Sequence, residues 1–294
     1  MTAAVTAPSG RRRLAAALHR RGRLRLGLLL AGPVGWLVVA YIGSLLILFL
    51  NSAWSRDAFT GLVIRELTLG NFTDIATNPL YRTVVIRTVV MAAAVTVTCA
   101  LLAFPIAYYM ARVASRRTKG LLVVAILMPL WASYLVKAYA WRLILSEEGV
   151  LNWLLGPLGL KGPGFGEIGL WLVFTYLWLP YMILPLYAGL ERIPTSLLEA
   201  SADLGAKGSL TFRRVILPLV IPALVAGSIF TFSLTLGDYI APSLITTTQF
   251  IGNLILSNFG VPDLPLAAAL SLVPLVIMIV YLLVARRLGA FEAL

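Results

Sequence analysis

Long apolar runs separated by short polar segments make up most of this chain. A helix needs about 20 mostly apolar residues to cross the hydrocarbon core of a bilayer. Six stretches reach that length: 26–50, 84–110, 121–145, 168–190, 217–237 and 264–285. The pattern therefore predicts an all-α membrane protein with six transmembrane helices.

Prolines interrupt several of these predicted helices. They lie well inside the apolar runs, at Pro105, Pro129, Pro180, Pro185, Pro222 and Pro274. Membrane helices tolerate proline because neighbouring helices can satisfy the backbone groups that it frees. Such kinks are typical of a bundle that encloses a path and also of simple packing, and the sequence leaves both interpretations open.

Composition agrees with a membrane protein and excludes a large soluble core. Of the 294 residues, 60% are hydrophobic and 12% are charged, whereas a soluble domain averages roughly 45–50% apolar and about 25% charged residues. The net charge of +12 is spread over the connecting segments. We therefore interpret it as a signal of membrane topology and not of nucleic-acid binding.

The basic residues indicate which side each connection occupies. Seventeen of the 24 bases lie in the two tails and in the loops after the second and fourth apolar stretches. The other three loops hold only four, namely Arg56, Arg65, Arg82 and Lys161. Because bases accumulate on the cytoplasmic side of a membrane, we expect both termini to be cytoplasmic.

These features divide the chain into four predicted parts. Residues 1–25 form a basic cytoplasmic tail, 26–50 the first transmembrane helix, 51–83 an extracytoplasmic loop, and 84–290 a five-helix core. The run 26–50 exceeds the apolar region of a cleaved signal peptide, which is about 7–15 residues long. It is therefore predicted to be a retained transmembrane helix.

Residues that carry chemistry are scarce. The single cysteine, Cys99, excludes an internal disulfide, and its apolar surroundings indicate an inert buried thiol. The single histidine, His19, lies in the basic tail, so no His/Cys cluster has metal-ligand spacing. The sequence therefore predicts neither a metal site nor an enzyme.

The polar segment 196–216, between the fourth and fifth apolar stretches, carries helix and turn signals. Ser196 and Glu199 fit a capping box, Gly205 fits the glycine that follows a helix end, and Ser209 can begin a second short helix. Three positions share one helical face: Leu197, Ala200 and Leu204. The segment is either a docking site for a partner or a solvated loop.

This segment resembles the EAA motif of ABC importer permeases, which reads Glu-Ala-Ala, three residues, Gly, nine residues, an aliphatic, one residue, Leu-Pro. The chain departs from it only at Ser201, which replaces the second alanine. In that family the segment is the coupling helix and sits in a cleft of the ATPase subunit. The resemblance implies that ATPase coupling involves Glu199, Ala200, Ser201, Asp203, Leu204 and Gly205.

The chain contains no Gly-x-x-x-x-Gly-Lys-Ser/Thr sequence and so no P-loop of its own. The resemblance therefore implies that ATP and Mg are bound by a partner ATPase and that this chain holds no cofactor. Its implied partners are a second homologous permease subunit, two copies of an ABC ATPase, an extracytoplasmic substrate-binding protein and the lipid bilayer of a bacterial plasma membrane.

From about residue 67 onward the chain also resembles the spermidine/putrescine permeases. The stretches that carry this likeness include MPLWASYLVKAYAWRLIL and FTFSLTLGDYIAPSLI. The likeness implies a type I ABC importer permease fold and a polyamine substrate. Related permeases are thought to carry opines, 4-aminobutyrate or aminoethylphosphonate, and these stay open as alternatives.

A cationic substrate needs acidic or aromatic side chains along its path, because an ammonium over an aromatic ring gains roughly 0.5–2 kcal/mol. Asp238 and Tyr239, at the outer end of the fifth stretch, and Trp178 and Tyr181 are the candidates. The rings are alternatively interfacial. Asp238 is alternatively a helix cap or an internal partner of Lys137.

A secondary transporter is the competing class of function. It would need ion-coupling carboxylates inside the membrane. No Asp or Glu lies at the centre of any of the six apolar stretches, which argues against it.

Overall fold

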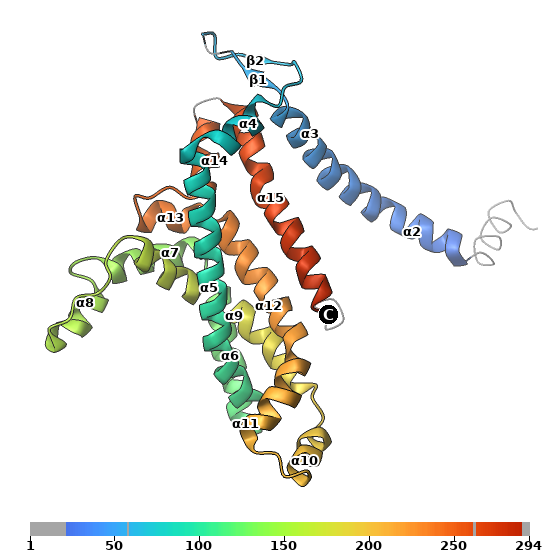
Figure 1. Ribbon diagram of the computed structural model, residues 1–294, viewed down its shortest axis with the longest axis vertical. Coiled ribbons are helices and arrows are strands. Elements are labelled where there is room, and N and C mark those ends of the chain that lie inside the picture. Colours follow the sequence, from blue (N-terminus) through green and yellow to red (C-terminus); the bar gives the residue numbers. More distant parts are fainter. Residues whose placement is uncertain (1–21, 58, 261–262, 290–294) are drawn as a thin grey trace, which may run out of the picture.

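The computed structural model describes residues 22–57, 59–260 and 263–289, which are mostly helical (Figure 1). Most of the predicted basic tail 1–25, with His19, and the last residue of the predicted core lie outside the described residues. Five helices are long and apolar enough to cross a membrane, and a bent helix pair makes a sixth span if it is counted as one. The predicted all-α membrane fold is confirmed.

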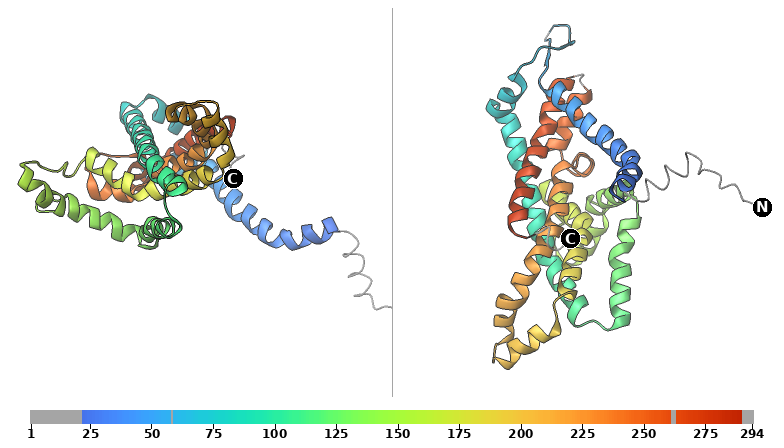
Figure 2. Two further views of the ribbon diagram at one scale, coloured as in Figure 1. Left: turned by 90° about the horizontal axis from the view of Figure 1, so that it is seen from below. Right: turned by 90° about the vertical axis from the view of Figure 1, so that its right-hand side faces the viewer.

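The first span stands apart from the bundle. It comprises α2 (Gly22–Leu37), the π-helical turn η1 (Val38–Ile42) and α3 (Gly43–Ser52). None of its spanning window is buried, and it packs on the bundle through α3 and α15 (Leu264–Arg287). Figures 1 and 2 show α2 extending away from the other helices.

The loop that follows begins with two short antiparallel strands, β1 (Ser55–Arg56) and β2 (Val63–Ile64), in which Ser55 pairs with Ile64. Helix α4 (Gly70–Thr77) comes next. The second span, α5 (Pro79–Arg112), starts five residues before the predicted position 84. The earlier start has a local cause, because the Asn78 side chain accepts a hydrogen bond from the N–H of Leu80 and proline occupies the first helical position.

The predicted third span, 121–145, is not one continuous helix. It consists of α6 (Arg116–Trp131) and α7 (Tyr134–Leu145), whose axes are bent by 94°. Ala132 and Ser133 take extended ψ angles of 142° and 138° between them. Ser133 is the only polar residue at the break, so the stretch stays apolar enough to be interpreted as one span.

Helices α5, α9 and α12 make the central core. After α8 (Val150–Leu155) and the short η2 (Gly156–Leu158) comes α9 (Glu167–Glu191), which packs on α5 and on α12 (Leu217–Gly237). A Cβ at Gly227 would lie 2.8 Å from the Sδ of Met182, so glycine lets α12 and α9 approach closely, as is typical of membrane helices. The thiol of Cys99 is buried in this core, as predicted.

Between α9 and α12 lie α10 (Thr195–Asp203), α11 (Gly208–Thr211) and the π-helical turn η3 (Phe212–Ile216). The last two continue into α12 as one helix from Gly208 to Gly237. The predicted separate second helix at Ser209 is therefore the beginning of the fifth span. Helices α13 (Ile240–Ile245) and α14 (Ile251–Gly260) lead on to α15.

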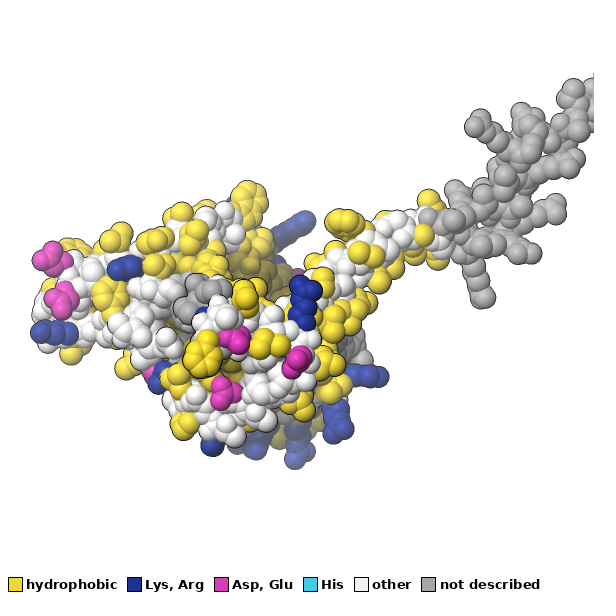
Figure 3. Space-filling view, turned by 90° about the horizontal axis from the view of Figure 1, so that it is seen from above, with side chains coloured by type: hydrophobic (Ala, Val, Ile, Leu, Met, Phe, Trp, Pro, Cys, Tyr) yellow, Lys and Arg dark blue, Asp and Glu magenta, His cyan; other side chains and the backbone are white. Residues whose placement is uncertain are grey.

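The two ends of the molecule differ. Helices α10 and α11 lie at one end, and β1, β2, α4 and the end of α14 lie at the other (Figure 1). Figure 3 looks onto the second end and shows acidic side chains on it, whereas many basic side chains lie at the distant, fainter end. This division matches the predicted split of bases between the connections.

We expect cysteine labelling to report this orientation. Arg116→Cys and Lys207→Cys should react with a membrane-impermeant maleimide only after cells are permeabilised, and Asp74→Cys and Asp263→Cys should react in intact cells. The reason is the accumulation of bases on the cytoplasmic side. The parent chain is the control because its own Cys99 is buried, and one reversed position would show that the assignment of sides is wrong.

Candidate coupling segment and candidate translocation path

The coupling segment begins differently from the prediction. Helix α10 starts at Thr195 with Pro194 at the N-cap, and no side chain caps it. Ser196 is therefore already inside the helix, and the predicted capping box is wrong. Proline has no side-chain oxygen to accept an N–H, but its fixed φ of −62° leads the chain into the helix.

The end of α10 is as predicted. Gly205 has a φ of +75°, its N–H donates to the carbonyl of Ala202 at 2.8 Å, and the N–H of Ala206 donates to the carbonyl of Ser201 at 3.1 Å. These two bonds are the Schellman motif, which glycine favours because the left-handed conformation costs other residues about 1 kcal/mol or more. Gly205 thus ends the helix and turns the chain.

Ser201 joins the two sides of that turn. It is 9% exposed, and its hydroxyl lies 2.8 Å from the hydroxyl of Thr211 at the end of α11. Alanine, the residue that the EAA motif has at this position, would lack the bond. The departure from the motif therefore adds a link between α10 and α11.

The outer surface of α10 is apolar and acidic. Glu199, Ala200 and Asp203 are exposed, as are Leu197 and Leu204, the latter with 88% of its surface accessible. No ion pair within 4.0 Å uses Glu199 or Asp203 among the described residues. The segment therefore presents a small apolar face with two acids, as a docking helix would.

Asp238, the first candidate of the path, is bonded through both carboxylate oxygens. Its Oδ1 accepts the N–H groups of Ile240 at 2.8 Å and Ala241 at 3.1 Å, and its Oδ2 accepts the hydroxyl of Tyr134. Within the described chain no ion pair joins Asp238 to Lys137. The helix-cap interpretation is confirmed, and the pairing with Lys137 is wrong because Tyr134 takes that place.

Tyr134 also connects Asp238 to the predicted aromatic residues. Its ring stacks on Trp178 with centroids 5.9 Å apart and planes 8° apart. The ring centroids of Trp178 and Tyr181 are 6.0 Å apart, and those of Tyr181 and Phe230 are 6.3 Å apart. The structure thus gathers three of the four predicted path residues in one row that begins at a carboxylate.

Tyr239 is not part of this row. Its side chain is 43% exposed, and its carbonyl accepts the amide N–H of Asn253 at 3.1 Å. The same amide donates to the hydroxyl of Ser243 at 2.6 Å. Asn253 therefore braces the turn that holds Asp238, and its own Oδ1 is buried with no hydrogen-bond partner in the described part of the chain.

Gly252 permits this brace. A Cβ at Gly252 would lie 2.6 Å from the carbonyl oxygen of Asp238, so only glycine lets α14 pack so closely on the turn. The sequence interpretation missed Gly252, Asn253 and the role of Tyr134. Each of these residues contacts a segment that is remote in sequence, so no local pattern pointed to them.

The row begins at the end of the fifth span, where Asp238 follows the last residue of α12, as the sequence placed it. Figure 1 shows α7 and α13 partway along the molecule, whereas α14 continues to the end that carries α4. Two interrupted helices, α6–α7 and α12–α13, thus meet at the level of Asp238, and such interruptions occur inside membranes where they line a cavity or are buried in protein.

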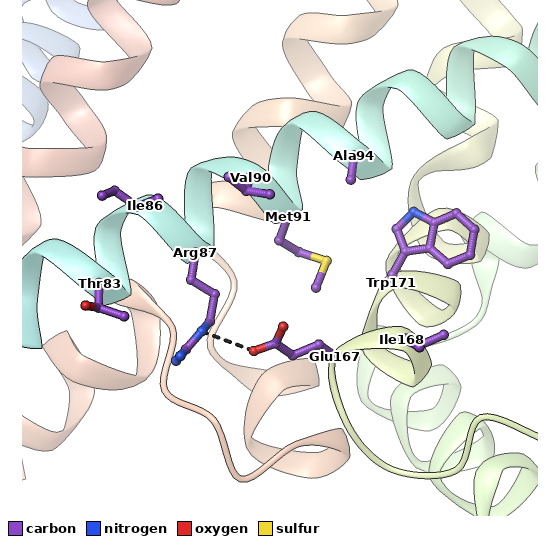
Figure 4. A pocket seen from close by; sticks show the side chains of 9 residues that line it. All are labelled: Thr83, Ile86, Arg87, Val90, Met91, Ala94, Glu167, Ile168 and Trp171. Carbon is purple, nitrogen blue, oxygen red and sulfur yellow. Dashed lines mark ion pairs between the residues drawn. The ribbon is translucent and has the colours of Figure 1, made fainter.

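A separate groove runs along the outer halves of α5 and α9 (Figure 4). It has a volume of about 610 Å³ and is lined mainly by apolar side chains, among them Trp171. Its charged members, Arg87 and Glu167, form an ion pair with Nε and Oε1 3.1 Å apart. No residue of the Asp238 row lines this groove, so it is distinct from the candidate path.

The described chain is a bundle of candidate membrane-spanning helices with an exposed helix, α10, at one end. Among the described residues, no group of three or more His, Cys, Asp or Glu is placed to hold a metal ion. The family described as "Binding-protein-dependent transport system inner membrane component" matches residues 103–291. That match includes α10, α12 and α13.

Two proteins of Escherichia coli strain K12 are similar along most of their length. The inner membrane ABC transporter permease protein YdcU is 49% identical over 293 residues, 94% of this chain and 93% of that protein. The spermidine/putrescine transport system permease protein PotB is 32% identical over 266 residues, 86% and 94% respectively. A solved structure, a bacterial alginate ABC transporter in complex with alginate pentasaccharide-bound periplasmic protein, matches with a TM-score of 0.72 at 15% identity, over 96% of this chain and 98% of that one.

This chain therefore belongs to the family of binding-protein-dependent transport system inner membrane components, the permease subunits of ABC transporters. It is a multi-pass inner-membrane protein with the predicted ABC importer permease fold. It is not an enzyme, because ATP hydrolysis belongs to a separate subunit in this family.

The close packing at Gly252 leads to a prediction about stability. Gly252→Ala should lower the melting temperature of the purified protein, because overpacking against a backbone oxygen costs about 1–3 kcal/mol. Gly120→Ala, in α6, is the matched control: no atom lies within 4 Å of its added Cβ, and alanine favours a helix by about 1 kcal/mol. An unchanged melting temperature for Gly252→Ala would contradict the brace.

Proposed function

We propose that this chain forms half of the translocation pore of an ATP-driven importer and that residues 196–216 couple it to the ATPase. The observation that carries the proposal is the exposed face of α10, with Leu204 at 88% exposure beside Glu199 and Asp203. An apolar helix face rimmed by charge suits a groove in a partner. The EAA spacing supports the same role.

The proposed assembly contains a second, similar permease subunit, two copies of an ABC ATPase and an extracytoplasmic substrate-binding protein. One coupling segment in this chain fits one of two ATPase copies. Both termini are proposed to be cytoplasmic, and the bases at the end that carries α10 support that orientation. ATPase closure would then shift the equilibrium between inward-facing and outward-facing bundles through α10.

The proposed substrate is a polyamine or a related small amino compound. PotB, at 32% identity, supports a polyamine, and the row from Asp238 through Tyr134 and Trp178 to Tyr181 has the chemistry for an ammonium group. A carboxylate and stacked rings attract a cation without enclosing it. Tyr239 is proposed as a weaker contact beside the row.

A second class of substrate has one observation in its favour. The indole N–H of Trp178 is buried without a hydrogen-bond partner among the described residues. A donor of this kind suits a substrate that also carries an acceptor, as 4-aminobutyrate, an opine or aminoethylphosphonate does. Competition of a panel of polyamines and amino acids for uptake would separate the two classes.

The coupling role predicts loss of ATPase contact. Glu199→Lys and Gly205→Val should each lower the amount of ATPase that co-purifies with the permease, because one reverses a charge on the docking face and the other strains the left-handed turn. We expect a fall of about tenfold, which corresponds to about 1.4 kcal/mol. Glu148→Lys is the charge-matched control, since it is an exposed acid far from α10.

Membrane insertion should be unchanged in all three variants. If Glu199→Lys and Gly205→Val both retain the ATPase and transport at the normal rate, residues 196–216 do not couple the two subunits.

The path role predicts that the charge of Asp238 affects substrate uptake, in addition to the role of its carboxylate in accepting the first N–H groups of α13. Asp238→Asn keeps an oxygen that can accept the N–H groups of Ile240 and Ala241 but removes the charge. We expect uptake of multivalent amines to fall by about tenfold and that of monovalent amines to fall less, since attraction grows with substrate charge. Uptake assays on assembled complexes measure this difference.

Tyr134→Phe is the companion variant, because it keeps the stacking on Trp178 and removes only the bond to Asp238. It should retain the discrimination between multivalent and monovalent amines. Equal uptake of every amine by Asp238→Asn and the unaltered protein would leave Asp238 as a helix cap only.

A further inference from the structure

Residues 190–194, the stem of the coupling helix, join the end of α9 to the start of α10. Helix α9 ends at Glu191, and three residues later α10 begins after Pro194. The final carbonyls of a helix lack intrahelical partners and carry partial negative charge. The last turn of α9 contains no basic residue, and the base Arg192 follows at the C-cap position.

Arg112, the last residue of α5, brings a cation from another element to the end of α9. Its Nη2 donates to the carbonyl of Leu190 at 2.7 Å and to the carbonyl of Ile193 at 2.8 Å. These two carbonyls stand on either side of the end of α9, directly before the coupling segment. Leu190 and Ile193 are themselves buried, at 0% and 5% exposure, so the contact is sheltered and hydrogen bonds to a charged donor are strong there.

A second contact between charged groups also lies at the end of α9. Glu191 lies at the C-terminal end of α9, where the helix dipole disfavours an acid. Lys119, from the start of α6, pairs with it at 2.8 Å between Nζ and Oε1. The same ammonium lies 5.7 Å from the ring centroid of Tyr187. The end of α9 is thus held by cations from α5 and from α6.

We propose that Arg112 is a positioning residue for coupling: it ties the stem of α10 to α5, so that displacement of α10 moves α5 and α9 together. The inference rests on the proposed coupling role of residues 196–216. Helix α5 extends 34 residues from this contact to Pro79 and packs along both α9 and α12. It is therefore one continuous helix from the end that carries α10 to the level of the Asp238 row and beyond.

The alternative is that Arg112 only caps a helix and stabilises the fold. The two roles differ in a measurable quantity, the number of substrate molecules imported per ATP hydrolysed. A structural cap affects how much complex assembles, whereas a coupling contact affects what an assembled complex does with each hydrolysis event.

The experiment compares Arg112→Ala and Arg112→Lys in complexes reconstituted with the cognate ATPase, second permease subunit and binding protein. We expect Arg112→Ala to retain the ATPase but to import about tenfold less substrate per ATP, within the 5- to 150-fold range that coupling free energies usually produce. Arg112→Lys should recover part of the ratio, because a single nitrogen makes both bonds and an ammonium has three donors.

Arg116→Ala is the control, since it removes an exposed base that lies only four residues after Arg112 in the sequence. Lys119→Ala breaks the second contact and should lower the ratio less than Arg112→Ala does. It also covers the case in which Arg112→Ala fails to assemble.

The inference is overturned if assembled Arg112→Ala complexes import the normal amount per ATP. It is equally overturned if Arg112→Ala does not assemble while Arg112→Lys and Lys119→Ala both show the normal ratio. Failure of the proposed function itself would look different, because the unaltered permease would then not retain the ATPase at all.

Discussion

A backbone group inside a bilayer has no water to bind, and this constraint governs how the chain interrupts its helices. Both interruptions, α6–α7 and α12–α13, meet at Asp238. One carboxylate oxygen satisfies the N–H groups of Ile240 and Ala241, and the other takes the hydroxyl of Tyr134 at the start of α7. A single acid therefore joins the two helix breaks. Its position sets the level at which both helices are interrupted.

The same constraint explains the packing around that level. Helix α14 approaches the Asp238 turn at Gly252, where a side chain would meet a backbone oxygen, and the amide of Asn253 takes the carbonyl of Tyr239. The aromatic row from Tyr134 to Phe230 then fills the space between α7, α9 and α12. A charge placed among stacked rings and well-bonded backbone is suited to contact a cation briefly.

At the other end, the problem is to connect a small exposed helix to long buried ones. Helix α10 is exposed along most of its length, whereas α5, α9 and α12 form the core. The contacts of Arg112 and Lys119 lie where the exposed helix joins α9. The proposed coupling segment at one end and the row at mid-molecule are thus linked by the same pair of core helices, α5 and α9.

The sequence by itself determined the class of protein. Long apolar runs indicate membrane helices, because burial in lipid requires them. The EAA spacing marks the segment that we propose as the coupling segment, and Gly205 marks its turn, because a turn with positive φ favours glycine. Both signals are local. They place α5, α9, α12 and α15 to within a few residues, and they place the end of α10 correctly.

Tertiary structure decided what the local signals could not. The break between α6 and α7 lies in a stretch that is apolar except for Ser133, and Pro129 before it also fits a simple kink, so only packing shows the 94° bend. Tyr134 reaches Asp238 across 104 residues of sequence, and Arg112 reaches Leu190 and Ile193 across 78 and 81. Apolar periodicity records which face of a helix is covered but not by what, and hydrogen bonds between remote segments exist only once the helices have packed.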